Sequence, residues 1–140
     1  MRLEVTRKSD LAVRSLRVLA GSERRLKGPE IAERVESTPG FVSQVLAPLV
    51  RAGWVRSEPG PSGGYVLAVP LESISVLAVI EVIEGPTDSG RCVLAGGPCN
   101  RDGICALHEP WSDARSKLLE ALDGISVAIA SLGPTRDRPL

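Results

Sequence analysis

Aromatic residues are scarce in this chain: two tryptophans, one tyrosine and one phenylalanine occur among 140 residues. A hydrophobic core must therefore be built mainly from Leu, Val, Ile and Ala side chains. A chain of this length is expected to form one domain, or one domain with an appendage. Because a small core stabilises a domain only modestly, a chain of this size often gains stability by forming oligomers.

Long apolar runs are also absent. No stretch approaches the length of about 18 apolar residues that a membrane-spanning helix needs. The N-terminal segment MRLEVTRKSD lacks the apolar centre of a secretion signal. We therefore expect a cytoplasmic protein with no membrane partner.

The chain has no net charge, with 17 Lys/Arg and 17 Asp/Glu, but the charges are unevenly distributed. Residues 1–58 carry a net charge of +4, and residues 59–140 carry a net charge of −4. A basic N-terminal half favours a polyanionic partner such as nucleic acid.

Cysteine and histidine are few, and they are clustered. Cys92, Cys99, Cys105 and the single histidine, His108, all lie within CVLAGGPCNRDGICALH (92–108). Three cysteines cannot all pair within one chain. Without a secretion signal, clustered thiols favour metal binding or redox chemistry over a disulfide framework.

Apolar residues at helical spacing predict three helices in the N-terminal half, over residues 9–20, 29–35 and 38–52. Two β-prone runs follow, at 54–57 and 64–69, and the turn EPGPSG joins them. Two helices separated by a short turn and followed by a hairpin indicate a winged helix-turn-helix, which binds DNA. The alternative is a small α+β domain with no ligand.

Two further helices are predicted beyond the hairpin. Ser75 can cap a fourth helix that stops at Gly85. An apolar stripe then predicts a long fifth helix from Pro110, formed by Trp111, Ala114, Leu118 and Leu122, with Leu119 beside it. This stripe can pack on its own domain, but the small size of that domain favours a dimer. The run ISVAIAS (125–131) is expected to add a short helix, followed by a frayed tail.

The cysteine spacing favours an iron–sulfur cluster. Six and five residues separate the cysteines, unlike the close C-x-x-C pairs of structural zinc sites. Glycines at 96, 97 and 103 let the loop wrap a larger group, and three thiolates leave one ligand position open. His108, three residues after Cys105, is a candidate for it, or it is a structural histidine at a helix start. The cysteines can instead be incidental small apolar residues. A thiol enzyme is a further alternative, which would need a histidine base and a third, orienting group.

Several segments, in this order, resemble one known family. They are the opening MRL, then DLAVRSL, LVRAGWVRS running into GGY, ISVLAVIEVIEG and, above all, the three cysteines followed by CALHEPW. Up to about residue 131 the chain resembles the winged-helix iron–sulfur transcriptional regulators of the IscR and NsrR type. The resemblance implies a mainly α fold with a small β-hairpin, in which a winged helix-turn-helix domain precedes a long C-terminal dimerisation helix. It implies a regulator and no enzyme activity.

The resemblance also implies a cluster, expected to be 2Fe–2S rather than 4Fe–4S, held by Cys92, Cys99 and Cys105. In IscR-like members the fourth ligand is the histidine three residues past the last cysteine, which matches His108. In NsrR-like members it is an acidic residue near the start of the first helix of the other subunit, which matches Asp10. Both remain open, and Asp10 can instead be a carboxylate favoured by the helix dipole.

DNA contacts are implied by the same resemblance. The recognition helix matches residues 38–52, and the wing matches the hairpin. The expected DNA-binding residues are Thr38, Gly40, Phe41, Ser43 and Gln44 in the helix, Ser62, Gly63, Gly64 and Tyr65 in the wing, and Arg51 and Arg56. Gln44 can contact adenine and Ser43 a base or a phosphate, whereas the two arginines are expected to contact phosphates. Pro59 stands where many members carry a minor-groove arginine.

The predicted organisation is a DNA-binding domain (1–85), a cysteine loop (86–109), a dimerisation helix region (110–131) and a flexible tail (132–140). The predicted function is that of a homodimeric repressor of a double-stranded DNA operator. Its DNA affinity is controlled by an iron–sulfur cluster that senses redox state, nitric oxide or the supply of iron and clusters. The alternative is a cluster-free winged-helix regulator that senses thiol oxidation or a small-molecule effector.

Overall fold

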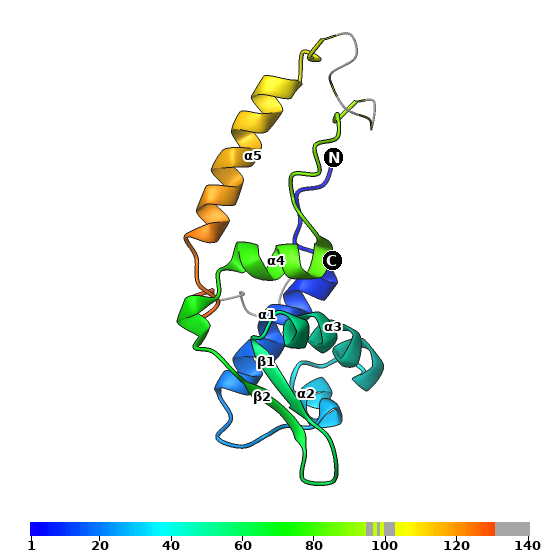
Figure 1. Ribbon diagram of the computed structural model, residues 1–140, viewed down its shortest axis with the longest axis vertical. Coiled ribbons are helices and arrows are strands. Elements are labelled where there is room, and N and C mark those ends of the chain that lie inside the picture. Colours follow the sequence, from blue (N-terminus) through cyan, green and yellow to red (C-terminus); the bar gives the residue numbers. More distant parts are fainter. Residues whose placement is uncertain (95–96, 98, 100–102, 131–140) are drawn as a thin grey trace.

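The computed structural model describes residues 1–94, 97, 99 and 103–130. Its helices and strands are α1 (Arg7–Ala20), α2 (Gly28–Arg34), α3 (Pro39–Arg51), β1 (Val55–Glu58), β2 (Gly64–Leu67), the 3-10 turn η1 (Leu71–Ser73), α4 (Val76–Glu84) and α5 (His108–Asp123). The helices α1–α4 and the hairpin form one body, from which α5 projects (Figure 1). The expected class, mainly α with one small hairpin, is confirmed.

Short polar side chains begin the main helices, as the sequence predicts for two of them. The Thr38 hydroxyl accepts a hydrogen bond from the amide of Phe41 at 3.2 Å, and the Ser75 hydroxyl accepts one from Ala78 at 3.0 Å. Thr6 caps α1 in the same way. Such caps satisfy amides that have no partner within the helix. They fix where the recognition helix and α4 start.

The core is aliphatic, as the scarcity of aromatic residues requires. The helix α1 lies at its centre and packs on α3, α4, α2 and β2. Its buried apolar residues meet those of α2 and α3, and all of them are aliphatic: Leu11, Val13, Leu16, Leu19, Ile31, Val35, Val42, Val45, Leu46 and Leu49. The packing on α1 therefore sets the position of α3.

The wing is an antiparallel hairpin in which Val55 pairs with Leu67 and Glu58 with Gly64. A third segment, between α1 and α2, joins its outer edge, because Leu26 and Tyr65 exchange two backbone hydrogen bonds of 2.7 and 3.0 Å. The two backbones are so close that a Cβ on Gly64 would lie 2.8 Å from the Leu26 carbonyl oxygen. The connection between the first two helices thus braces the wing.

The prediction of a short helix over 125–131 is wrong for its described part, residues 125–130. Ser126 instead forms an antiparallel bridge with Ser75, and Val127 is completely buried in the core. The guanidinium of Arg17 on α1 donates to the carbonyl oxygens of Val127 and Ala130, at 3.2 and 2.7 Å. The backbone of Ile125 and Val127 therefore bonds to the winged-helix body, and the residues from Ser126 to Ala130 close only a single turn of their own.

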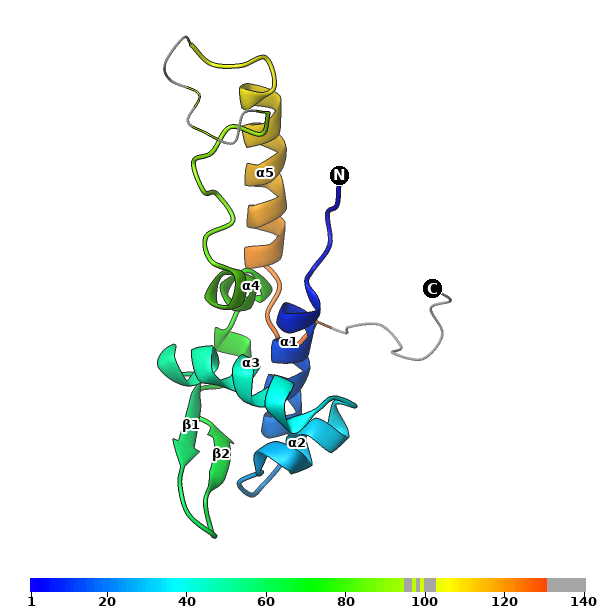
Figure 2. The same ribbon diagram turned by 90° about the vertical axis from the view of Figure 1, so that its right-hand side faces the viewer.

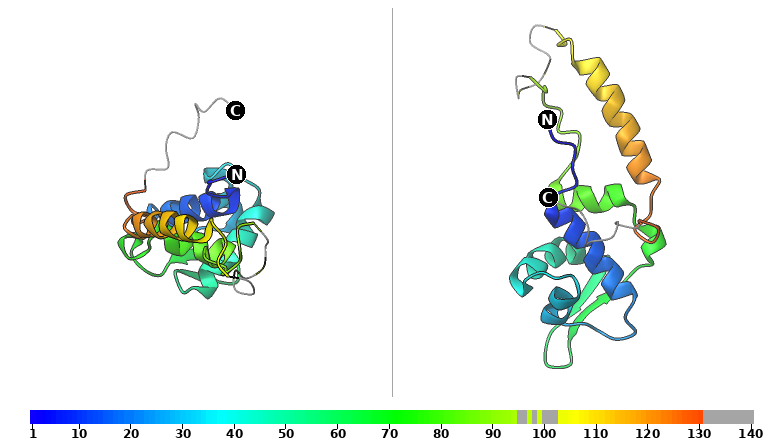
Figure 3. Two further views of the ribbon diagram at one scale, coloured as in Figure 1. Left: turned by 90° about the horizontal axis from the view of Figure 1, so that it is seen from above. Right: turned by 180° about the vertical axis from the view of Figure 1, so that it is seen from behind.

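The wing and the cysteine loop lie at opposite ends of the molecule. Figures 1 and 2 show the hairpin pointing away from the body on one side and α5 extending on the other, with the loop beyond the far end of α5. The view from behind in Figure 3 shows the same separation. Among the described residues, no helix is both long and apolar enough to span a bilayer. The predicted tail, 132–140, lies outside the described residues.

Candidate functional site

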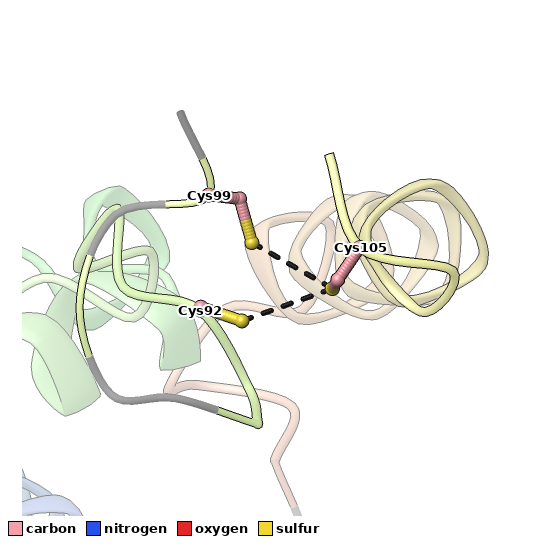
Figure 4. A group of neighbouring side chains, drawn as sticks. All are labelled: Cys92, Cys99 and Cys105. Carbon is pink, nitrogen blue, oxygen red and sulfur yellow. Dashed lines mark hydrogen bonds between the residues drawn. The ribbon is translucent and has the colours of Figure 1, made fainter. Parts of the chain in front are cut away.

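The three cysteine thiols converge. Cys105 Sγ lies 3.7 Å from Cys92 Sγ and 3.6 Å from Cys99 Sγ, and all three sulfur atoms lie within 4.8 Å of one another. Figure 4 shows Cys92 and Cys99 pointing toward Cys105, which stands beside the start of α5. All three residues are half-buried, and none forms a disulfide. The fold of the loop therefore brings the three thiols together.

A pocket of about 170 Å³ surrounds these thiols. One wall is the chain that leaves α4, including Asp88 and Arg91, and the other is one face of α5. His108, Trp111, Ser112 and Arg115 line that second wall. Their spacing of three, four and seven residues places them on a single face of the helix. The pocket thus lies between α5 and the chain that follows α4.

Hydrogen bonds to the other two cysteines affect the acidity of the Cys99 thiol. The Cys99 thiol is hydrogen-bonded chiefly to Cys92 and also to Cys105, and this raises the pKa of Cys99 to about 11. A thiol with a raised pKa stays protonated at neutral pH. Thiolates are the metal ligands, so a metal bound here has to displace this proton.

The two candidates for the fourth ligand lie in different places. His108 is the first residue of α5 and lines the cysteine pocket, and its amide donates to the Cys105 carbonyl at 3.1 Å. A turn, rather than a shared helix face, therefore brings His108 and Cys105 together. Asp10 lies in the first turn of α1, where it pairs with Arg14 at 3.7 Å, and it is not among the described residues that line this pocket.

The donor set fits a soft metal centre. Thiolate and imidazole ligands suit iron–sulfur clusters or zinc, whereas calcium and magnesium prefer oxygen ligands. Three thiols and one histidine around one pocket supply the four ligands that such a centre needs. These residues therefore fit the cluster that the sequence predicts.

A hydrogen bond ties the start of α1 to the end of α4, immediately before the cysteine loop. The buried hydroxyl of Ser9 donates to a carboxylate oxygen of Glu84, the last residue of α4. A carboxylate is favoured near the positive end of the α1 dipole. The contact links the loop's entry point to the helix on which the recognition helix packs.

Four of the five residues expected to bind DNA from residues 38–52 are exposed: Thr38, which caps α3, and three residues within the helix. Gly40, Ser43 and Gln44 are exposed, whereas Val42 and Val45 are buried. Phe41 is half-buried and packs against the core, and the Thr38 side chain caps the helix. Gly40, Ser43 and Gln44 have the spacing of one helix face, and that face is exposed to solvent.

The wing residues divide into two groups. Arg56 and Ser62 are exposed, as is Arg51 at the end of α3. Gly63 is buried, because a Cβ there would lie 2.0 Å from the carbonyl oxygen of Glu58. Gly64 and Tyr65 pair with the neighbouring strands. The positions of these last three residues are thus explained by the wing's own packing.

Sequence reasoning missed a set of cations beside the wing. Arg24, Arg25 and Lys27 precede α2 and line an open pocket of about 550 Å³ together with Arg56 and Ser62. Arg25 contacts Glu58 at 2.7 Å and Arg24 contacts Glu30 at 2.6 Å, and the second ion pair lowers the pKa of Glu30. The run RRLK was the available signal, but only the Leu26–Tyr65 pairing brings it to the wing.

The projecting helix α5 has no buried residue. Its apolar residues at positions 111, 114, 118 and 122 follow the steps of three and four that place side chains along one side of a helix. Leu118, the most exposed leucine of the helix, is 43% exposed. The face is apolar: Trp111 lines the cysteine pocket, and Leu118 lies further along the helix, where it is exposed.

The known proteins that this chain is similar to are transcriptional regulators. A sequence model of the Rrf2 family, described as iron-dependent transcriptional regulators, matches residues 5–130. The transcriptional regulator IscR of Aliivibrio salmonicida is 34% identical over 98 residues, which are 70% of this chain and 58% of that relative. This chain thus spans less than two thirds of the length of that relative.

Two solved structures are similar throughout most of their length. T. potens IscR has a TM-score of 0.71 and 28% identity, over 90% of this chain and 84% of that one. CymR, described as the global cysteine regulator of B. subtilis, has a TM-score of 0.73 and 26% identity, over 91% and 95%. Both share the winged-helix arrangement found here. With the family match covering nearly all of its described length, the chain belongs to the Rrf2 family of transcriptional regulators.

Proposed function

We propose that this protein is a homodimeric DNA-binding repressor whose affinity for its operator is controlled by an iron–sulfur cluster. The observation that carries the proposal is the convergence of Cys92, Cys99 and Cys105 within 4.8 Å, between α4 and α5, in a member of this family. The relatives named IscR support it, as does the description of the family as iron-dependent.

DNA binding is assigned to the exposed face of α3 and to the wing. Gly40 lets the backbone approach the groove, while Ser43 and Gln44 offer hydrogen bonds to base edges. Arg51 and Arg56 neutralise phosphates on either side. The aliphatic core holds α3 against α1, so the reading face is fixed before DNA arrives.

The three cysteines are the protein's proposed cluster ligands, and His108 is the proposed fourth ligand of a 2Fe–2S cluster. When bound, such a cluster would supply a centre that responds to redox state, nitric oxide or iron supply. His108 is favoured because it lines the same pocket as the thiols. Asp10 of the partner subunit is the competing ligand, and choosing between them requires the variants described below.

The route from the loop to the DNA runs through α4. This helix packs on α1, α3 and α5, and its last residue, Glu84, is tied to Ser9. Freed thiols would release the chain between α4 and α5. A change at either helix would then alter the spacing of two recognition helices in a dimer, which must match half-sites about one helical turn apart.

A cysteine variant tests the cluster assignment. Anaerobically purified protein is expected to contain iron and acid-labile sulfide and to absorb visible light, and Cys99→Ala should remove both. Ser116→Ala, an exposed substitution on α5, is the control and should leave them unchanged. His108→Ala should change the spectrum, whereas Asp10→Ala should not. A Cys99→Ala protein with wild-type iron, sulfide and colour would refute the assignment. Zinc in place of iron would identify the site as a zinc site and refute the cluster.

A second candidate function is a cluster-free thiol sensor. Its support is the separation of 3.6 to 3.7 Å between Cys105 and each of the other two thiols, together with the similarity to CymR. Thiols this close can form a disulfide after small movements. This candidate predicts protein without iron or sulfide, whose DNA affinity changes when peroxide is added and recovers with a thiol reductant.

A further inference from the structure

We propose that the charge of Arg115, which is paired with Asp88, raises the reduction potential of the group bound by the three cysteines. This inference rests on the proposed function, since it concerns the same pocket. Nothing in the sequence pattern singled out either residue. Their role follows from where the structure places them.

Arg115 extends from α5 into the wall of the cysteine pocket. Its Nη1 lies 3.3 Å from Oδ1 of Asp88, which belongs to the chain leading from α4 into the loop. Both residues line the pocket that contains all three thiols. The Arg115 side chain is only 21% exposed, whereas that of Asp88 is 62% exposed. The cation is therefore the inner member of the pair and the carboxylate the outer one.

The sign of the effect follows from the charge of the site. Three thiolates outweigh the positive charge of an iron–sulfide core, so the assembled site is anionic and becomes more so when it gains an electron. A nearby cation stabilises the more negative state and raises the potential. Because Arg115 is mostly buried, salt and water screen its field less than they screen that of a surface charge. Asp88 opposes this effect, but more weakly because it is exposed.

The same ion pair also joins the entry of the loop to α5. A purely mechanical role would therefore be a simpler explanation, and the two roles make different predictions. If the ion pair only holds the loop to α5, removing either partner breaks it. Substitutions of Arg115 and Asp88 would then shift the potential in the same direction. An electrostatic role requires Arg115→Gln and Asp88→Asn to act in opposite directions.

The test is the midpoint potential of anaerobically loaded protein, measured by spectroelectrochemistry at constant pH and salt. Arg115→Gln should shift the potential to more negative values, and Asp88→Asn should shift it to more positive values. Arg115→Lys should restore most of the wild-type potential, because it keeps the charge. Lys117→Gln is the matched control, since Lys117 lies on the same helix but does not line the pocket, and it should cause no shift.

The outcomes are distinct. Loaded variants with unchanged potentials, or with shifts in the same direction, overturn the role of Arg115 while the cluster assignment stands. Wild-type protein with no iron or sulfide overturns the proposed function and this inference together. If Arg115→Gln fails to load, the other two variants decide between the electrostatic and the mechanical role. A positive shift of the potential in Asp88→Asn, with a near wild-type potential in Arg115→Lys, supports the electrostatic role. Any other result overturns it.

Discussion

Two glycines, Gly63 and Gly40, differ in what surrounds them. Gly63 is required by the wing, because any side chain would collide with the backbone at Glu58 and Pro59. Gly40 lies exposed on α3, and a Cβ there would meet nothing within 4 Å. One glycine serves packing and the other leaves space for a partner.

These two positions should respond oppositely to the same change. Gly63→Ala should lower the free energy of unfolding by about 1–3 kcal/mol, the usual cost of forcing atoms into a closely packed site. Gly40→Ala should leave it unchanged or raise it by up to about 1 kcal/mol, because alanine favours helix. Urea denaturation followed by circular dichroism measures both. Gly40→Ala should nevertheless weaken binding to operator DNA, and equal stability losses in the two variants would contradict this division.

At the scale of elements, most helices could be predicted and the links between them could not. Thr38, Ser75 and Gly85 mark helix ends because capping and left-handed backbone depend on local residues. The third segment of the wing depends on Leu26 meeting Tyr65, which no local pattern contains. The segment after α5 was mistaken for a helix because its apolar residues fit that spacing, whereas contacts with Ser75 and Arg17 decide its structure.

The apolar face of α5 carries the prediction about assembly. Leu118→Glu places a charge in the middle of the proposed dimer interface and should shift the protein from dimer to monomer. Lys117→Glu introduces the same residue one position away, outside the apolar stripe, and should leave the dimer intact. Light scattering after size-exclusion chromatography gives the mass in each case. A Leu118→Glu protein that remains dimeric would place the interface elsewhere.

For the whole molecule, the sequence groups those candidate residues that lie close together along the chain. Cys92, Cys99, Cys105 and His108 lie within one loop, and the structure places all four around one pocket. Arg115 and Asp88 were missed because charged residues on a helix and before a loop usually face solvent. Only the packing of α5 beside the chain that leaves α4 turns them toward the thiols.

DNA binding should depend steeply on salt, because phosphate contacts release counterions. Against a duplex selected from a random-sequence pool, Arg56→Gln should weaken binding to all sequences and reduce the salt slope by about one. Gln44→Ala should change the preferred sequence with little effect on the slope. Filter binding or fluorescence anisotropy across a salt series measures both. Arg56→Gln with an unchanged slope would remove the wing from the interface.

The burial of Val127 affects the order in which the chain can fold. The winged-helix body, formed largely by residues 7–84, includes this residue from beyond α5, and the backbone there is bonded to Ile74 and held by Arg17. During synthesis, the cysteine loop therefore leaves the ribosome before the DNA-binding body can be completed. A shortened chain that ends at residue 85 would lack Val127 from its core, so we expect it to be less stable than the full chain. The winged-helix body is therefore complete only after the cysteine loop has been made.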